Sequence, residues 1–304
     1  MNASTAAPRP SRARAWVLAS RPATLLAGVV PVVVGSAVAA HEGGFSLLPA
    51  LAALVGSLLI QIATNLANDY YDHKKGADGA DRLGPARAAQ MGWIAPRDLL
   101  VGTGLCLGLA LLVGLYLIAV GGWPIALLGV LSLLLAVGYT GGPYPLAYHG
   151  LGDLFVLLFF GYGAVCGTAW VQTGTVSLTG LLAATSVGLL ATGILVVNNL
   201  RDRLGDMRAN KRTLAVRFGA RAARLEYSAC VGLAFLMPVL GLLAGEGSAL
   251  WLLPWLALPL GVGAVRAIWT TDGAALNPWL GKTARLELVF GLLFALALVL
   301  SRPG

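Results

Sequence analysis

The feature that most constrains this chain is a series of apolar runs, each about as long as a helix that crosses a lipid bilayer. Such a helix needs roughly 20 apolar residues to span a hydrocarbon core about 30 Å thick. Nine runs meet or approach this length, at residues 22–40, 46–67, 98–120, 124–140, 153–172, 177–199, 225–244, 249–269 and 285–301. With 58% hydrophobic and 11% charged residues among 304, the chain is too apolar for a soluble domain. The sequence predicts an all-α membrane protein of about nine helices.

No long polar segment divides these runs, so residues 15–304 are expected to form one transmembrane domain of two similar halves. Residues 1–14 are polar and are expected to form a mobile tail. The cysteines Cys106, Cys166 and Cys230 fall singly in separate runs. We expect them to be small core residues, because this spacing fits neither a disulfide framework nor a zinc site.

The basic residues predict an orientation. Of the 21 lysines and arginines, 20 fall before the first run, between the second and third, between the sixth and seventh, or where the eighth run meets the ninth, the last group being Arg266, Lys282 and Arg285. The positive-inside rule then places the N-terminus in the cytoplasm and the C-terminus outside. The net charge of +8 is therefore a topology signal. Nucleic-acid binding would need a basic soluble face, which this arrangement does not leave.

Two polar islands interrupt the apolar pattern. The first is NLANDYYDHKKGAD at 65–78, after the second run, and the other is NNLRDRLGDMRANKRTL at 198–214, after the sixth run. Both contain Asn-x-x-x-Asp, and both fall on the predicted cytoplasmic side. The repetition predicts a duplicated site.

Each island places three polar side chains on one helix face, because residues three and four apart are neighbours there. They are Asn65, Asp69 and Asp72 in the first island and Asn198, Asp202 and Asp206 in the second. An aspartate costs roughly 2.5–3.5 kcal/mol at mid-bilayer, so facing acidic stripes require a cation. Oxygen ligands without His or Cys favour Mg²⁺, with Mn²⁺ as a second candidate. Two such ions would clamp a diphosphate, with neighbouring lysines and arginines on its outer oxygens.

Two other interpretations of these residues stay open. Acidic and basic residues at helix ends are common in loops and need no ligand. A cation-coupled transporter would also carry aspartates on a repeated scaffold. Transporter sites usually lie near the middle of the bilayer, whereas both islands are predicted at one surface, flanked by basic residues.

The motifs resemble a known family. NDYYD at 68–72 with GAD at 76–78, and NNLRDRLGD at 198–206 with KRTLAVRFG at 211–219, resemble the UbiA superfamily of intramembrane prenyltransferases. RPATL at 21–25, GPARAAQMG at 84–92 and YTGGPYPLAYHGLGD at 139–153 resemble its 1,4-dihydroxy-2-naphthoate polyprenyltransferases. The chain departs from these patterns at two positions. Gly76 stands where the superfamily's first motif has a third acid, and Asn210 stands where this subgroup is expected to have glycine.

The resemblance implies a UbiA-like helical bundle with both Asp-rich motifs at the cytoplasmic side of a bacterial inner membrane. It implies an Mg²⁺-dependent reaction in which a polyprenyl diphosphate ionises to an allylic cation, with its tail in the lipid bilayer. The ring of 1,4-dihydroxy-2-naphthoate attacks the cation, and carbon dioxide and a proton are lost to give a demethylmenaquinone. Other branches of the family would use 4-hydroxybenzoate, homogentisate, a porphyrin or another lipid as acceptor.

The resemblance also implies roles for single residues. The metal ligands are expected to be Asn68, Asp69, Asp72, Asp202 and Asp206, the four aspartates being catalytic together with Tyr139, whose ring would face the cation. Substrate binding is expected of Asn65, Asn68, Asp78, Lys211, Arg212, Asn198, Gln61 and Tyr148. Among these, Lys211 and Arg212 would hold the diphosphate or the naphthoate carboxylate, and Gln61 would contact the acceptor ring. Asp153 is expected to cap the helix that follows it.

Overall fold

The computed structural model describes residues 10–77 and 82–301, and the protein is helical throughout these ranges apart from turns and loops. Eight helices of the described chain are long and apolar enough to cross a membrane. A shorter apolar helix, α5 (Trp123–Gly138), has 16 residues. The predicted all-α membrane fold is confirmed, while a count of nine spans stays a prediction.

Most elements follow the predicted runs, but two helices begin at Leu214 and Asn277, well before the runs predicted from 225 and 285. In chain order they are α1 (Arg12–Ala19), α2 (Pro22–His41), α3 (Leu47–Lys74), α4 (Pro96–Gly121), α5, η1 (Leu146–Tyr148), α6 (Gly152–Val156), η2 (Leu157–Cys166), α7 (Gly167–Thr173), α8 (Leu178–Arg208), α9 (Leu214–Leu243), η3 (Ala249–Ala257), α10 (Leu258–Thr270), η4 (Gly273–Leu276) and α11 (Asn277–Leu300). The segments α6, η2 and α7 together form one continuous helical segment that is long and apolar enough to cross a membrane, and so do η3 and α10.

The boundary predicted for the N-terminal tail is wrong in part. Residues 1–9 lie outside the described chain, but α1 begins at Arg12. The Ser11 hydroxyl accepts the Arg14 backbone N–H over 3.3 Å and caps this helix. Ala15 and Ala19 are buried in a small cluster with residues of α3 and α4. The segment is ordered because its small residues pack against the bundle.

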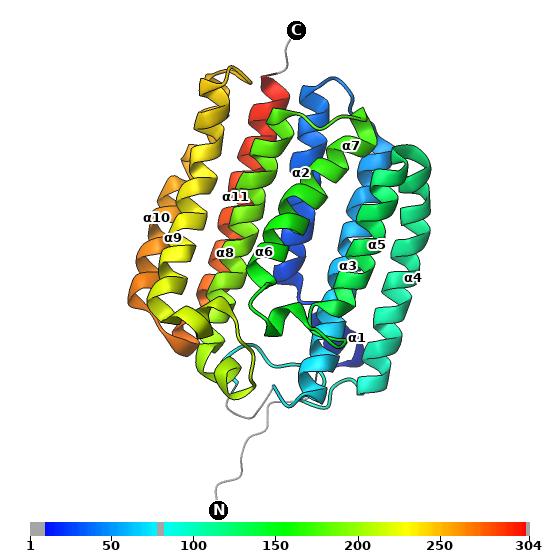
Figure 1. The fold of residues 1–304 in the computed structure, drawn as a ribbon, viewed down its shortest axis with the longest axis vertical. Helices are drawn as coiled ribbons and strands as arrows, with labels where there is room; N and C mark the ends of the chain where they lie inside the picture. The colour runs from blue at the N-terminus through cyan, green and yellow to red at the C-terminus, as the bar shows by residue number, and fades with distance from the viewer. Residues whose placement is uncertain (1–9, 78–81, 302–304) are drawn as a thin grey trace, which may run out of the picture.

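The main core lies between α2, α8, α9 and α11, and α8 runs through its middle (Figure 1). Four aromatic rings, Phe235, Phe290, Phe294 and Trp251, meet edge to face within it. The helices α3, α4 and α5 form a thinner layer on the other side, where many leucines are exposed as expected of lipid-facing surfaces.

The π-helical segment η2 packs backbone to backbone on α8. A Cβ added at Gly161 would lie 2.6 Å from the Ala184 carbonyl oxygen, and one at Gly188 would lie 2.8 Å from the Gly161 Cα. Only glycine allows this approach, a common device in membrane helices. Helical turns of this wider type often occur at functional sites, and η2 lines the cavity described below.

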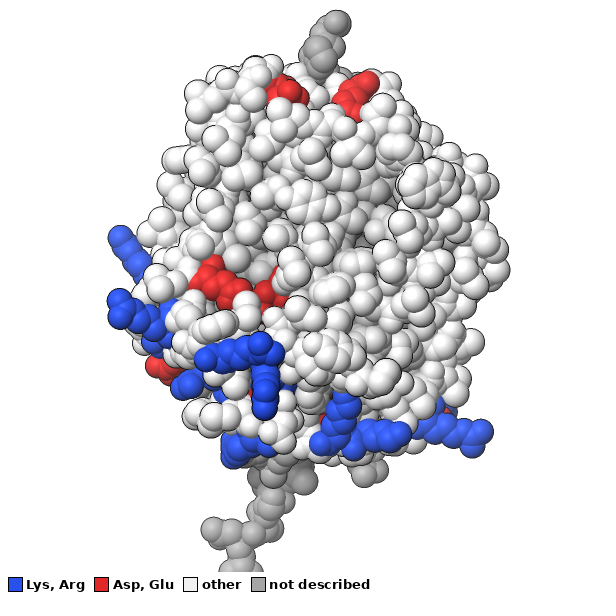
Figure 2. All heavy atoms as spheres, in the orientation of Figure 1, with Lys and Arg blue, Asp and Glu red and all other residues white. Residues whose placement is uncertain are grey.

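Both polar islands are helical. The helices α3 and α8 continue past the apolar runs to Lys74 and Arg208, because neither glycine nor proline stops them earlier. The two islands therefore lie at the same end of the bundle. Figure 2 shows that the visible lysines and arginines gather around this end and leave the opposite end bare. This agrees with the charge pattern, and the orientation in a membrane stays a prediction.

Candidate active site

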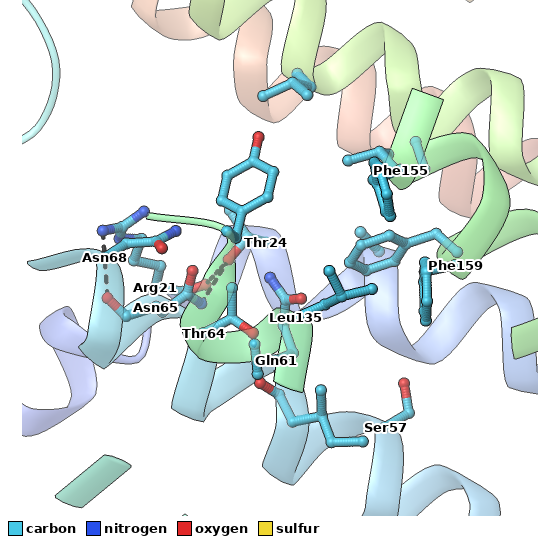
Figure 3. Close-up of a pocket in the computed structure, with 18 of the residues that line it drawn as sticks. Arg21, Thr24, Ser57, Gln61, Thr64, Asn65, Asn68, Leu135, Phe155 and Phe159 are labelled. Atoms are coloured by element: carbon cyan, nitrogen blue, oxygen red, sulfur yellow. Dashed lines mark hydrogen bonds between the residues drawn. The ribbon is translucent and has the colours of Figure 1, made fainter. Parts of the chain in front are cut away.

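A cavity of about 800 Å³ lies between α2, α3, α5, η2 and α8. Its polar end is lined by side chains of both islands and of the loop at 82–88, namely Asn65, Asn68, Asp69, Asp72, Arg82, Arg87, Asn198, Arg201 and Lys211. The remainder is mostly apolar, with Phe155 and Phe159 on one wall and Gln61 and Thr64 on another (Figure 3). The cavity thus has one charged end, and the rest of its lining is apolar.

Asp69 fastens a loop over the first island. One of its carboxylate oxygens accepts the Ala88 backbone N–H at 2.9 Å, and the other accepts the Ala89 N–H at 3.2 Å. The Asp69 residue is only 1% exposed. Because Ala88, Ala89 and Ile94 pack beside Leu66, the carboxylate ties the GPARAAQMG segment to α3.

Asp72 is held by two side chains from other parts of the chain. The Tyr148 hydroxyl donates to Asp72 Oδ1 over 3.1 Å, and Arg87 forms an ion pair with Oδ2 at 3.3 Å. Lys75 stacks on the Tyr148 ring, 4.2 Å from its centroid, and donates to the Thr140 carbonyl. Burial of the Lys75 ammonium lowers its pKa from the ordinary lysine value. Tyr148 therefore joins the first island to the loop after α5.

Arg201 organises the second island from inside the protein. Its residue is 2% exposed, and its guanidinium donates to both oxygens of Asp202, at 2.8 and 2.5 Å, and to Asn198 Oδ1 at 2.7 Å. The Asn277 side chain accepts a further bond at 3.1 Å. The cation thus compensates the Asp202 charge. The sequence pattern places Arg201 among the basic residues that could neutralise the outer phosphate oxygens or act as a topology signal, and it does not predict the inward position of this side chain.

The end of α8 places a lysine beside Asp206. Asn210 has a positive φ of 55°, and the Lys211 N–H returns to the Asp206 carbonyl at 2.8 Å. This left-handed turn is a Schellman motif, which explains why a glycine or asparagine is needed there. Lys211 Nζ lies 3.7 Å from Asp206 Oδ1. Burial lowers the Lys211 pKa, but the carboxylates of Asp72, Asp206 and Asp202 outweigh it and raise the pKa overall, so the ammonium stays charged.

The two islands therefore meet, as the stripes predicted. Lys211 interacts electrostatically with the aspartates of both. Asp202 and Asp206 do not themselves line the cavity but lie behind Arg201 and Lys211, which do. The structure does not bring Arg212 to the cavity: its side chain is exposed and its backbone N–H donates to the Tyr148 carbonyl. Asp78 lies outside the described residues.

Other predicted residues do reach the cavity. Asn65, Asn68, Gln61, Asn198 and Tyr139 all line it. Asn65 donates to the Ser20 carbonyl and the Thr24 hydroxyl, both over 2.9 Å, and so also ties α3 to the start of α2 (Figure 3). The amide of Asn68 accepts a hydrogen bond from Thr140. Burial, and to a smaller degree Asp153, raises the pKa of the Tyr139 phenol, which therefore stays neutral.

The expected capping role of Asp153 is wrong. The N-cap position of α6 is Leu151, and Asp153 is the second residue of the helix. Its carboxylate lines the cavity instead. The sequence offered one signal for this position, its place at the end of the YTGGPYPLAYHGLGD segment, but a cap after two glycines was the simpler interpretation.

The donor atoms at the polar end suit a hard cation. Within residues 10–77 and 82–301, no three His, Cys, Asp or Glu side chains form a ready-made metal cluster. Asp206 Oδ2 is nevertheless buried without a hydrogen-bond partner in this part of the chain. Because Mg²⁺ binds through one or two carboxylates and completes its shell with phosphate oxygens and water, the acids of the two islands fit this ion together with a phosphorylated ligand.

Comparisons with known proteins agree with this geometry. Residues 28–300 match the UbiA prenyltransferase family. The chain is 40% identical to a 1,4-dihydroxy-2-naphthoate octaprenyltransferase of Escherichia coli over 96% of this chain and 97% of that protein. Its fold is similar to the apo structure of a UbiA homolog from Aeropyrum pernix, with a TM-score of 0.69, 17% identity and coverage of 90% and 97%. A UbiA homolog from Archaeoglobus fulgidus, solved with GPP and Mg²⁺, gives a TM-score of 0.63 at 16% identity over 94% and 99%.

Proposed function

The chain belongs to the UbiA prenyltransferase family, and on that premise we propose that it transfers a polyprenyl group from a polyprenyl diphosphate to 1,4-dihydroxy-2-naphthoate. Carbon dioxide is lost and a demethylmenaquinone is formed, a step of menaquinone biosynthesis. The choice of acceptor is supported by the similarity, over nearly the full length, to a protein named 1,4-dihydroxy-2-naphthoate octaprenyltransferase.

The observation that carries the proposal is the division of the cavity into a charged end and an apolar body. A polyprenyl diphosphate has the same division, because its head is highly charged and its tail is a hydrocarbon. The diphosphate head would lie between Asp72 of α3 and Lys211, which lies in the loop just after α8. The tail would follow the wall that contains Phe155 and Phe159 towards the lipid (Figure 3).

The metal-binding residues proposed are Asn68, Asp69, Asp72, Asp202 and Asp206. Bound Mg²⁺ would supply positive charge that stabilises the leaving diphosphate. Two of these carboxylates have other partners in the described structure: Asp69 accepts two backbone amides, and Asp202 accepts Arg201. Asp72 pairs with Arg87 and Tyr148, and Asp206 pairs with Lys211. Asp206 is the strongest candidate, since its Oδ2 is buried without a hydrogen-bond partner in the described residues.

The chain's own side chains then have distinct tasks. Lys211 and Arg201 would hold phosphate oxygens, since both are cationic and line the cavity. Tyr139, a neutral phenol at the boundary between the charged end and the apolar body, would face the developing allylic cation through its ring. The apolar walls would exclude water, which would otherwise trap that cation.

The protein is a multi-pass membrane protein by its helices and its family. We place it in a bacterial inner membrane with the two islands facing the cytoplasm, on the strength of the charge pattern. This location would give the site access to a soluble acceptor from the cytoplasm and to a polyprenyl substrate from the bilayer.

The test is an assay of the purified protein in detergent with Mg²⁺, geranylgeranyl diphosphate, 1,4-dihydroxy-2-naphthoate and an equal amount of 4-hydroxybenzoate. Mass spectrometry reads the prenylated products, and EDTA is the control. We expect an EDTA-sensitive prenyl naphthoquinone and no prenylated benzoate. A product from 4-hydroxybenzoate alone would move the protein to another branch of the family. No product from folded protein that binds the diphosphate would contradict the proposed acceptor.

A further inference from the structure

A third carboxylate lines the cavity outside both polar islands. Asp153 is the second residue of α6, it is 5% exposed, and its side chain borders the same cavity as Asp69 and Asp72. Neither the capping role expected from the sequence nor the diphosphate site described above uses it. An ionisable group in the membrane-embedded part of a helix is costly and is usually functional.

The surroundings of Asp153 differ from those of the island acids. Asp72, Asp202 and Asp206 each pair with a lysine or arginine. In the described part of the chain, no basic side chain pairs with Asp153. Its closest side-chain donor is the Asn199 amide, 3.5 Å away, which is a weak hydrogen bond at most. A diphosphate would therefore be repelled by Asp153, because the described residues place no cation in an ion pair with it.

The hydroxyl of Tyr139 lies against the same turn of α6. A Cβ added at Gly152 would lie 2.8 Å from the Tyr139 hydroxyl oxygen, so the glycine leaves the space that this phenol occupies. The Tyr139 hydroxyl has no hydrogen-bond partner within residues 10–77 and 82–301. Since Asp153 and Tyr139 also interact electrostatically, one acceptor and one neutral donor stand side by side on the cavity wall.

A buried carboxylate without a cation is best satisfied by a neutral hydrogen-bond donor. The proposed acceptor offers two hydroxyl groups. The 1-hydroxyl lies beside the ring carboxylate and forms an internal hydrogen bond with it, as in other ortho-hydroxy acids. The 4-hydroxyl lies on the far side of the ring, away from the negative charge, and is free to donate.

We propose that Asp153 and Tyr139 form the acceptor subsite and that the Asp153 carboxylate accepts a hydrogen bond from the 4-hydroxyl of the hydroxynaphthoate. The inference rests on the proposed function. Tyr139 can donate to the same oxygen atom and so fix the ring in place. The hydrogen bond to a carboxylate increases electron density on the phenolic oxygen and hence on the ring that attacks the prenyl cation. Phe155, two residues further along, supplies an apolar face for the ring (Figure 3).

The test compares the wild type with Asp153→Asn, which keeps the size of the side chain and removes its charge. For each protein, kcat/KM is measured for 1,4-dihydroxy-2-naphthoate at saturating geranylgeranyl diphosphate, and the Kd of the diphosphate is measured with Mg²⁺ and no acceptor. We expect kcat/KM for the acceptor to fall by about tenfold or more, as for loss of a hydrogen bond to a charged group. The Kd of the diphosphate should change less than threefold, which also shows that the variant is folded.

A second comparison identifies the hydroxyl. The analogue 1-hydroxy-2-naphthoate lacks the 4-hydroxyl and is added as a competitor of the acceptor, so its Ki should be nearly the same for the wild type and for Asp153→Asn. The matched control is Glu226→Gln on α9, which removes a carboxylate that interacts with Asp153 electrostatically but does not line the cavity. This control should retain wild-type kcat/KM.

The inference is overturned if Asp153→Asn keeps acceptor kcat/KM within threefold of the wild type. It is also overturned if the variant weakens diphosphate binding as much as acceptor use, or if the Ki of 1-hydroxy-2-naphthoate rises by the same factor as the acceptor defect. These results are distinct from failure of the proposed function, in which the wild type itself forms no prenyl naphthoquinone.

Discussion

Asp72 and Asp206 occupy the same position at the ends of their helices. The main-chain carbonyl of each accepts the N–H five residues further along, from Ala77 at 2.9 Å and from Lys211 at 2.8 Å. In both turns the fourth residue after the aspartate, Gly76 or Asn210, has positive φ. Two separate segments thus end with the same backbone turn, which follows Asp72 in one and Asp206 in the other, at the same end of the bundle.

The turn at Asn210 gives a prediction about stability. Replacing Asn210 by alanine should destabilise the protein by about 1 kcal/mol, because alanine pays the left-handed penalty that asparagine partly avoids. Replacing it by glycine should be neutral or slightly stabilising. Thermal unfolding of the purified protein in detergent measures both. Equal unfolding temperatures for the alanine and glycine variants would show that this turn does not depend on the positive φ.

Asp69 is predicted to anchor the 84–92 segment. In Asp69→Asn, one of the two backbone amides of Ala88 and Ala89 would face an NH₂ group instead of an oxygen. Hydrogen bonds to charged groups contribute about 1.5–3 kcal/mol, so tryptic cleavage after the buried Arg87 should accelerate by roughly tenfold or more. The exposed acid Asp98 is the control, and Asp98→Asn should cleave like the wild type. Unchanged cleavage of Asp69→Asn would contradict the anchoring role.

The Tyr148 hydroxyl is predicted to position Asp72, so its loss should lower activity less than the loss of the Asp72 charge. Tyr148→Phe removes the hydroxyl that donates to Asp72 but keeps the ring beneath Lys75 and Lys211. We expect about a tenfold lower kcat/KM for the prenyl diphosphate. Asp72→Asn should lose roughly 100-fold or more, as for removal of a group that stabilises transition-state charge.

The control for this comparison is Tyr144→Phe. Tyr144 is exposed and stacks on His149, so its hydroxyl should not matter to the rate. The interpretation fails if Tyr148→Phe is as inactive as Asp72→Asn, or if it keeps full activity.

Orientation can be tested with single cysteines. In a background without Cys106, Cys166 and Cys230, Met207→Cys lies within the second island and Ser248→Cys lies at the opposite end, and both positions are exposed. An impermeant maleimide added to intact spheroplasts should label Ser248→Cys only, and permeabilised cells should label both. Labelling of Met207→Cys in intact spheroplasts would reverse the predicted topology.

The positions of the helices could be predicted from the sequence, because a membrane-length helix depends mainly on local hydrophobicity. The apolar lengths of α2 and α4 match their runs within two residues at each end. The convergence of the two islands also followed from spacing, since one helix face repeats every three to four residues. Asn210 was identified as a departure from glycine, and its positive φ explains why the position is restricted.

The remaining features depend on contacts between distant segments. Arg201 looked like one of several basic residues in a loop, yet it is buried between Asn198 and Asp202. Asp69 looked like a metal ligand alone, yet it also accepts two amides of a loop about 20 residues away. Asp153 looked like a helix cap because two glycines precede it at short range. Local sequence patterns do not show which distant segments pack together, and this packing determines the partners of all three residues.

The central claim is that both islands hold one diphosphate head group. It is tested most directly by isothermal titration of the protein with a non-reacting thiolodiphosphate analogue of farnesyl diphosphate in the presence of Mg²⁺. The wild type, Asp72→Asn and Asp206→Asn are compared, with Asp98→Asn as the control. We predict one binding event per chain that EDTA abolishes and that either island substitution weakens by about tenfold or more. Binding that survives either substitution unchanged would contradict a shared site.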